Sequence, residues 1–307
     1  MGIGCPLMDR EEMKLTLSLM VPGLTIFIIF AVFPILHSSI GSFFNWERWE
    51  MAEFAGLDLW IETLTDNSVI NPSGVLNFEF PMGVLPHNLL WMVVHVPISV
   101  FLGLGLALLL TDVKGGNVFR TIIFTTFTIT PMVIGMVLRF SLHQEAGFFN
   151  AILRVIGLGQ FTQNWLLNSQ QAIFFVIGAG VWVQAGFSMV VYHSGLAGLD
   201  ETLVEAAEVD GATAFERFKD IIWPRLKPVT AVVVVMSLVW VLRVFAIVYA
   251  AGGPTGGPRG AFNVLGVEIF QSAFRRPIEY GRAIILAVIE IIVAIPLAIY
   301  SAKLRRF

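Results

Sequence analysis

Six apolar runs, each long enough to cross a lipid bilayer, constrain this chain of 307 residues more than any other feature. A helix needs about 20 apolar residues to span the hydrocarbon layer. Because that layer holds no water, every backbone N–H and C=O must be bonded within its own segment, so each run is predicted to be a helix. The predicted fold is all-α: a polytopic membrane protein with six transmembrane helices. The runs are Met13–Gly41, Val84–Thr111, Phe119–Leu142, Gln171–Ser194, Val229–Ala251 and Gly281–Lys303, with kinks expected at the internal Pro34, Pro97, Pro131 and Pro296.

The composition excludes several other classes of protein. Hydrophobic residues make up 56% of the chain and charged residues only 13%, about half of what is usual for a soluble domain. A net charge of −3 argues against nucleic acid as a partner. The single cysteine, Cys5, excludes an internal disulfide, and no Cys/His cluster predicts a metal site. The first run is long and lacks a small-residue cleavage site, so we expect a retained span rather than a signal peptide.

The distribution of Lys and Arg predicts the orientation of the spans. With six spans both termini share one side, and the connections on that side carry eleven Lys and Arg against six on the other. Cytoplasmic connections are richer in Lys and Arg, so both termini are predicted to be cytoplasmic, with residues 1–12 as a short N-terminal segment. Two long segments, about Ser42–Gly83 and Ala251–Tyr280, then lie outside.

One predicted cytoplasmic connection concentrates charge between two apolar runs. The stretch Glu205–Pro224, "EAAEVDGATAFERFKDIIWP", holds seven charged residues in twenty. Its first part is predicted to be a helix that ends at Gly211, since glycine favours the left-handed conformation found at helix ends. Thr213 followed by Glu216 predicts a capping box at the start of a second helix. Pro224 is expected to end that helix.

The second short helix has an apolar face. Phe215, Phe218 and Ile222 recur at helical spacing, and charges of both signs occupy the remaining positions. A helix that lies on the membrane surface would be mainly basic. Aromatic side chains within a polar rim are typical of a protein–protein contact.

This stretch resembles the cytoplasmic EAA loop of the permease subunits of binding-protein-dependent ABC importers. The match comprises Glu205, Ala206, Ala207, Gly211, Ile221 and Pro224 at the family's spacing, with Trp223 where the family has Leu. The resemblance implies a coupling loop at about residues 195–228 that docks on an ATPase. The residues it implies for this contact are Glu205, Ala206, Ala207, Asp210, Gly211, Phe215, Phe218, Ile221 and Pro224.

Further segments resemble sugar-importer permeases of the maltose and glycerol-phosphate type. These are "FPILHSSIGSFFNW", "FAGLDLW", "FLGLGLALLL", "GGNVFRTIIF", "GFFNAILRVIGL", "VWVQAGFSMVVYHSGLAGLD" and the Gly-Pro loop "AAGGPTGGP", which is similar to that of the first of two permeases. The resemblance implies a type I ABC importer permease fold over residues 13–307, in the cell membrane. It also implies a sugar substrate, an extracytoplasmic solute-binding protein, a second permease that is a different chain, and two cytoplasmic ATPase subunits.

The chain is not expected to hydrolyse ATP itself. It contains no GxxxxGK[ST] motif, because "GGPTGGPRG" lacks the lysine and the helix that should follow it. No catalytic residue and no cofactor of its own are therefore predicted, and ATP with Mg²⁺ is expected to be bound by the partner ATPase subunits.

Polar residues inside the spans mark a candidate substrate pathway, because they are costly in lipid and face a cavity or another helix. An aromatic ring with amide and hydroxyl groups is the chemistry that a sugar site needs. Hydrogen bonds between helices are the competing explanation. The candidates are Gln184, Ser188 and Tyr192, every fourth residue of one span; Ser237, Trp240 and Arg243, every third residue of the next; and Asn263 beside the Gly-Pro loop.

Two mid-span charges leave a choice open. Arg243 and Glu290 are predicted to lie at similar depths in the membrane. Either the two side chains form a structural ion pair, or Arg243 binds an anionic group of the solute such as the phosphate of a sugar phosphate. Mid-membrane charges also occur in secondary transporters, which is the alternative function. No internal repeat supports that alternative. A permease for a solute other than a sugar also remains possible from the sequence.

Overall fold

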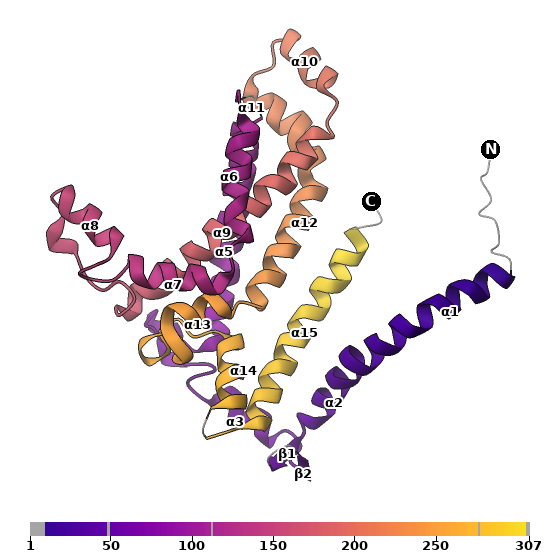
Figure 1. The fold of residues 1–307 in the computed structure, drawn as a ribbon, viewed down its shortest axis with the longest axis vertical. Coiled ribbons are helices and arrows are strands. Elements are labelled where there is room, and N and C mark those ends of the chain that lie inside the picture. Colours follow the sequence, from indigo (N-terminus) through magenta and orange to yellow (C-terminus); the bar gives the residue numbers. More distant parts are fainter. Residues whose placement is uncertain (1–9, 48–49, 112, 276, 305–307) are drawn as a thin grey trace.

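The computed structural model describes residues 10–47, 50–111, 113–275 and 277–304, so Cys5 and most of the 1–12 segment lie outside it. The described part is almost entirely helical, which confirms the all-α prediction (Figure 1). The elements that belong to the apolar spans are α1 (Arg10–Phe27), α2 (Phe33–Gly41), α5 (Val84–Leu109), α6 (Gly116–Thr128), α7 (Pro131–Ser141), α9 (Ser169–Ala197), α12 (Trp223–Leu242) and α15 (Tyr280–Leu304). The elements of the connections are β1 (Phe44–Glu47), β2 (Glu50–Phe54), α3 (Asp58–Thr65), α4 (Pro72–Asn77), α8 (Phe148–Val155), α10 (Glu201–Val209), α11 (Ala214–Arg217), α13 (Ala246–Gly252) and α14 (Leu265–Phe274).

Five helices in the described residues are long and apolar enough to cross a membrane, and the pair α6–α7 makes a sixth span if it is counted as one. That pair corrects the predicted straight span Phe119–Leu142, because α6 and α7 meet at an angle of 96°. The ring of Pro131 disfavours helical geometry at Thr130, whose ψ is 129°. Pro131 then starts α7, since proline suits the first turn of a helix. The expected kink is thus a complete break.

The predicted span Val229–Ala251 is also wrong in its outer part. Helix α12 ends at Leu242, with Arg243 as its C-cap, and α13 is a separate helix. At its other end the helix starts much earlier, because α11, a π-helical segment (Phe218–Ile222) and α12 run on without a break from Ala214 to Leu242.

Pro224 therefore does not end the second short helix, contrary to the sequence prediction. The N–H of Trp223 donates to the carbonyl of Phe218, five residues back, so the turn is wider than an α-helical turn. A wider turn makes room for the proline ring, which in an α-helix would clash with the carbonyl four residues before it. The first span repeats this arrangement: a π-helical segment, Ile28–Val32, stands directly before Phe33 and Pro34.

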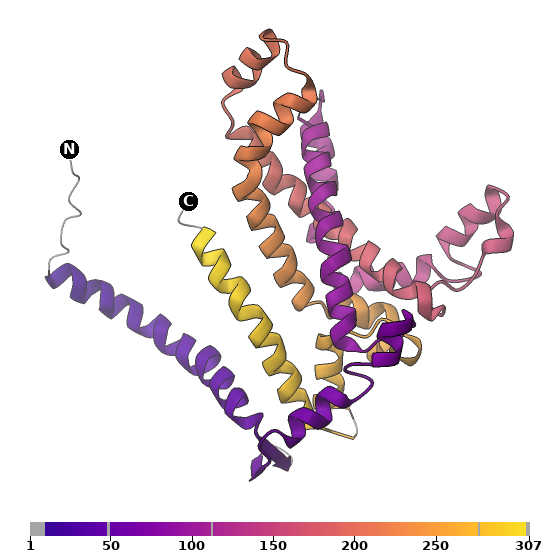
Figure 2. The same ribbon diagram turned by 180° about the vertical axis from the view of Figure 1, so that it is seen from behind.

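The buried core lies where α5, α9 and α12 pack together. Helices α5 and α9 approach closely at Gly103, where an added Cβ would stand 2.3 Å from the Cβ of Ser188. Trp91, Ile173 and Met189 are fully buried in this core. By contrast, Gly41 is the one buried residue of the first span, Ser18–Gly41, among the described residues, and α1 diverges from the other helices in both views (Figures 1 and 2).

The two ends of the molecule differ. The hairpin β1–β2 lies at one end with α3 and α14, and α10 projects from the opposite end (Figure 1). The N-terminal end of α1 and the C-terminal end of α15 both point away from the hairpin. The loop between α9 and α12 is thus the element that stands furthest from the hairpin.

Candidate functional site

The projecting loop is built by local rules that the sequence makes visible. Asp200 caps α10, since its Oδ1 accepts from the N–H of Thr202 at 3.1 Å. The predicted glycine terminator is confirmed, because Gly211 has φ +85° and so occupies a conformation that other residues rarely adopt. The capping box is confirmed as well: Glu216 accepts from the Thr213 N–H at 2.7 Å, and the Glu216 N–H donates to the Thr213 hydroxyl at 3.3 Å.

Both capping carboxylates are held in their ionised form. The backbone and side-chain hydrogen bonds from Thr213 lower the pKa of Glu216, and those from Thr202 lower the pKa of Asp200. The caps are therefore present at neutral pH and weaken only as the pH falls through the lowered pKa values. An ion pair of 2.5 Å between Arg217 and Glu208 joins α10 to the second short helix across Gly211. The ion pair and the caps hold these two short helices at a fixed angle. We call residues 201–217, which form the two helices and the turn between them, the elbow.

The apolar face predicted for this elbow is divided in the structure. The side chain of Phe215 is 71% exposed at the projecting end. Phe218 and Ile222 instead turn inward and pack against the core, with the Phe218 ring 6.1 Å from that of Trp223. The π-helical segment begins at Phe218 and changes the angular spacing of the side chains that follow. Phe215 is therefore the aromatic side chain of this helix that is open to a partner.

Glu205 is exposed at the base of the elbow. It lines a hollow of about 410 Å³ at the foot of the elbow, together with Thr111 at the end of α5 and Leu196 and Leu199 at the end of α9. The carboxylate is thus positioned where the elbow meets the ends of two spans. The other residues assigned to coupling divide by exposure: Ala206, Asp210, Gly211 and Pro224 are exposed, and Ala207 and Ile221 are half-buried.

A second hollow, of about 360 Å³, lies between the spans and brings together three of the predicted pathway residues: Gln184, Trp240 and Arg243. The break between α12 and α13 helps to form it, because residues 244–247 line it too. Gln184 also donates to the Ser237 hydroxyl at 3.2 Å, across α9 and α12. Gln184 therefore lines an open space and also makes a hydrogen bond between helices, so the two explanations that the sequence left as alternatives do not exclude each other at this position. We call this space the central hollow.

The remaining pathway candidates do not line the central hollow. Ser188, Tyr192 and Ser237 are buried where the helices pack. Asn263 is buried at the hairpin end, where its amide donates to Glu268 at 2.7 Å and its carbonyl contacts His87 Nδ1 at 2.8 Å. Of these four residues, Ser237 takes part in a hydrogen bond between spans, as the acceptor from Gln184, whereas the buried Ser188 hydroxyl has no hydrogen-bond partner among the described residues.

His95 is a residue of this site that the sequence reasoning missed. Its ring stacks on Trp240, with centroids 4.9 Å apart and planes 7° apart, and it is fully buried. His95 contacts Trp240 without lining the central hollow itself, whereas Phe127 and Phe187 do line it, with their rings 5.0 Å apart. A histidine in the middle of an apolar run was the available signal for His95. From the sequence alone, the phenylalanines that line the hollow cannot be distinguished from phenylalanines that face lipid.

The predicted Arg243–Glu290 ion pair is not formed in the described part of the chain. Glu290 is half-buried on α15 and close enough to Arg243 for their charges to interact. No N···O contact within 4 Å joins the two side chains. The break after Leu242 makes Arg243 the C-cap of α12, and its exposed side chain lines the central hollow instead.

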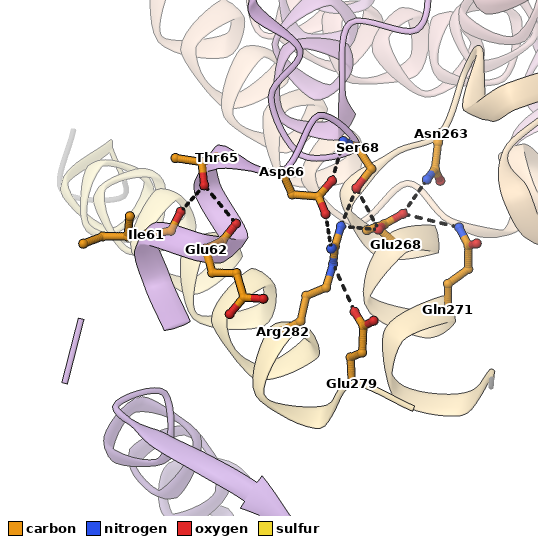
Figure 3. A network of polar contacts seen from close by, with 10 residues as sticks. All are labelled: Ile61, Glu62, Thr65, Asp66, Ser68, Asn263, Glu268, Gln271, Glu279 and Arg282. Atoms are coloured by element: carbon orange, nitrogen blue, oxygen red, sulfur yellow. Dashed lines mark hydrogen bonds and ion pairs between the residues drawn. The ribbon is translucent and has the colours of Figure 1, made fainter. Parts of the chain in front are cut away.

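The hairpin end holds a polar network around Arg282 that the sequence did not predict (Figure 3). Arg282 bonds Asp66 at 2.8 Å and Glu268 at 2.8 Å, and it also donates to the Ser68 hydroxyl. Asn263 and Gln271 donate to the other oxygen of Glu268. The network joins the segment after α3 to α14 and to the start of α15. The segment after α3 lies about 200 residues before these two helices in the sequence.

Replacing Arg282 with Met is expected to destabilise the folded chain by about 3 kcal/mol, because Glu268, with 11% of its side chain exposed, loses its counter-charge. Thermal unfolding of the purified protein measures this change. Arg275→Gln is a matched control, since Arg275 is exposed at the same end and makes no ion pair with a described residue. Equal stabilities of the Arg282→Met and Arg275→Gln proteins would contradict the expectation.

The same network predicts a dependence on acid. Burial alone would raise the pKa of Asp66, but the hydrogen bonds from Arg282 and Ser68 outweigh it and lower the pKa. The stabilisation is therefore present above the ordinary aspartate pKa and is lost as the pH falls through the lowered value. Asp66→Asn is expected to remove this part of the acid sensitivity.

No group of three or more His, Cys, Asp or Glu side chains in the described residues is arranged to hold a metal ion. The polar groups of the elbow and of the central hollow suit contacts with a protein and with a small polar solute.

Comparison with known proteins agrees with this arrangement. Residues 99–305 match the model of the family described as binding-protein-dependent transport system inner membrane component. A probable ABC transporter permease protein of Pyrococcus horikoshii is 37% identical over 88% of this chain and 91% of its own length. The trehalose/maltose transport system permease protein MalF of Thermococcus litoralis is 28% identical over 97% of this chain and 95% of its own.

A solved structure has the same fold. It is the crystal structure of a bacterial ABC transporter involved in the import of the acidic polysaccharide alginate, with a TM-score of 0.75 over 97% of this chain and 98% of that chain, at 20% identity. The match confirms the importer-permease fold expected from the sequence. The family match gives no support to the secondary-transporter alternative.

Proposed function

Because this chain belongs to the family of binding-protein-dependent transport system inner membrane components, we propose that it is the permease subunit of an ATP-driven importer of a sugar or oligosaccharide. The observation that carries the proposal is the braced elbow of α10 and α11, which projects from the ends of the spans with Phe215 exposed. Such an element suits docking on a cytoplasmic partner that supplies the energy.

The continuity of the elbow with α12 gives the coupling its physical basis. Residues 214–242 form one helix, so a force on the elbow reaches Trp240 and Arg243 without crossing a loop. From Trp223 to Trp240 this rod is about 25 Å long at 1.5 Å per residue. Closure of the ATPase subunits would move one end of the rod, and the central hollow at its other end would change its access from outside to inside.

The central hollow suits a carbohydrate. Trp240 offers an aromatic face for a sugar ring, and Gln184, whose buried amide oxygen has no hydrogen-bond partner among the described residues, supplies an amide group beside it. Related permeases named for trehalose/maltose, alpha-glucoside and lactose transport support this substrate class. One chain forms only half of the enclosure that the pathway needs, so a second permease, a different chain, would complete it.

The remaining partners follow from the same proposal. Two ATPase subunits would bind ATP and Mg²⁺ at the cytoplasmic side, an extracytoplasmic binding protein would deliver the solute, and this chain would itself be non-catalytic and without a cofactor. Both termini would lie in the cytoplasm, on the same side as the elbow.

Reconstitution tests the proposal. The complete transporter in vesicles, with its binding protein, is expected to take up a labelled oligosaccharide only when ATP is supplied on the cytoplasmic side. Uptake driven by an ion gradient without ATP, or purification of the chain without an ATPase, would contradict it.

Trp240→Ala is expected to raise the half-saturating solute concentration for uptake about tenfold, because the sugar loses an aromatic face worth about 1.4 kcal/mol. Initial uptake rates measured against solute concentration give this value. Trp240→Phe keeps an aromatic ring and should behave nearly as the parent protein does. A half-saturating concentration that is the same in Trp240→Ala as in Trp240→Phe would exclude a direct contact with the solute.

A further inference from the structure

A third hollow, of about 450 Å³, carries positive charge that the transport of a neutral sugar does not need. It is lined by the end of α7, the segment before α9 and the glycine-rich turn after α13. Arg139 and Arg259 both line it, with His143 and Asn164, and the residues that line it include no Asp or Glu. We call it the arginine hollow.

The two arginines have no counter-charge within the described chain. Neither makes a hydrogen bond or an ion pair with a described residue, and both side chains are exposed. Arg154, on the neighbouring helix α8, is satisfied by contrast, because it donates to the carbonyls of Gln144 and Glu145. Two like charges at one hollow repel each other, and a bound anion removes that cost.

The backbone under Arg259 supports a role for its side chain. Arg259 has φ +55° and ψ +20°, a left-handed conformation that costs a non-glycine residue about 1–2 kcal/mol. It lies in a turn where glycines occupy neighbouring positions of the same kind. A strained position that keeps a long cationic side chain points to a function for that side chain.

The arginine hollow and the central hollow lie along the same pair of packed helices. Helices α7 and α13 lie so close that a Cβ at Gly135 would stand 2.4 Å from the carbonyl oxygen of Ile247. Pro131, which starts α7, lines the central hollow, and Arg139, eight residues later, lines the arginine hollow. The two hollows are therefore about 12 Å apart along α7. Arg243 adds a third positive charge at the central hollow and makes no ion pair within 4 Å with a described residue.

We propose that Arg139 and Arg259 form an anion subsite for the carboxylate or phosphate group of an acidic carbohydrate that occupies the pathway. A guanidinium group matches either anion through two parallel charge-assisted hydrogen bonds. The inference rests on the proposed function and narrows the solute to acidic sugars. A neutral sugar leaves these charges without a partner.

The test compares matched pairs of solutes. The complete transporter, with its binding protein, is placed in phosphatidylcholine vesicles and offered galactose or galacturonate, maltotriose or trigalacturonate, and glycerol or glycerol 3-phosphate. We expect ATP-dependent uptake of the acidic member of a pair. In the double variant Arg139→Gln/Arg259→Gln, uptake of that solute below saturation should fall at least tenfold, with the rate at saturation and the basal ATPase activity nearly unchanged.

The controls separate charge from general damage. Arg139→Lys/Arg259→Lys keeps the charge and should retain most of the uptake. Arg275→Gln removes one exposed charge at the hairpin end, away from both hollows, and should behave as the parent protein does. Uptake of the neutral member, unaffected by the double variant, would overturn this inference and leave the proposed function standing. Uptake of no sugar of either kind would overturn both.

Two further outcomes would show that the arginines bind a partner other than the solute, and each would overturn the inference. If the defect appears only in vesicles that contain phosphatidylglycerol, the arginines bind a lipid headgroup. If the double variant weakens co-sedimentation of the binding protein with the vesicles, they bind that protein.

Discussion

Replacing Gly211 with Pro is expected to reduce ATP-dependent uptake at least tenfold while the chain still inserts in the membrane and the ATPase subunits still hydrolyse ATP. Proline fixes φ near −65°, whereas Gly211 has φ +85° and donates its N–H to the carbonyl of Glu208. The change costs about 3 kcal/mol locally and opens the angle between α10 and α11. The ATPase then moves an elbow that no longer holds its shape. Uptake and ATP hydrolysis, measured on the same vesicles, show this loss of coupling.

Milder substitutions at Gly211 provide the controls. A Cβ at this position meets no atom within 4 Å, so Gly211→Ala changes only the backbone preference and should give an intermediate uptake. Gly211→Asn, which tolerates the left-handed conformation better, should come closer to the parent protein. Glu205→Lys places a cation in the hollow at the foot of the elbow and should uncouple transport as well. Normal uptake in both Gly211→Pro and Glu205→Lys would refute the role of the elbow.

Replacing Phe215 with Asp is expected to weaken the binding of the ATPase subunits about thirtyfold, which corresponds to about 2 kcal/mol at an aromatic hot spot. Phe215 is the exposed aromatic side chain of the elbow, and the bracing contacts of the elbow do not involve it. The affinity of the solubilised permease pair for its ATPase subunits, measured by titration, reports the effect.

Phe274→Asp is the matched control, because Phe274 is a similarly exposed phenylalanine on α14 at the hairpin end. It should leave the affinity for the ATPase unchanged. If the two substitutions weaken binding equally, the loss reflects damage to the fold and Phe215 is not an anchor of this contact.

Local rules made much of the fold predictable. The spans that became α5, α9 and α15 are continuous apolar runs, and their ends fall within a few residues of the predictions. The elbow was predictable in detail because caps depend on neighbours in sequence: Thr213 with Glu216, and Gly211 at the end of α10. The resemblance of this stretch to a known family then indicated what the elbow contacts.

Several predictions are wrong where packing between segments that are distant in the sequence determines the structure. The apolar run through Val244 and Ala250 gives no sign that α12 stops at Leu242, because the break is supported by α7, which packs against α13. Similarly, Gln184 and Ser188 are both polar and lie four residues apart on one stripe of the same span, yet of the two only Gln184 reaches the central hollow. Which polar side chain faces an open space depends on the neighbouring helices, and a single helix does not encode it.

The π-helical segment before Pro224 fixes an angular phase between the two working ends of this subunit. In a regular α-helix each residue turns the chain by about 100°, so a residue added to such a helix rotates one end of it relative to the other. The π-helical turn holds one more residue than an α-helical turn and takes up that rotation locally. The same number of residues wound as regular α-helix would turn the elbow by roughly 100° relative to the central hollow, so the widened turn sets the relative orientation of the two ends of this subunit.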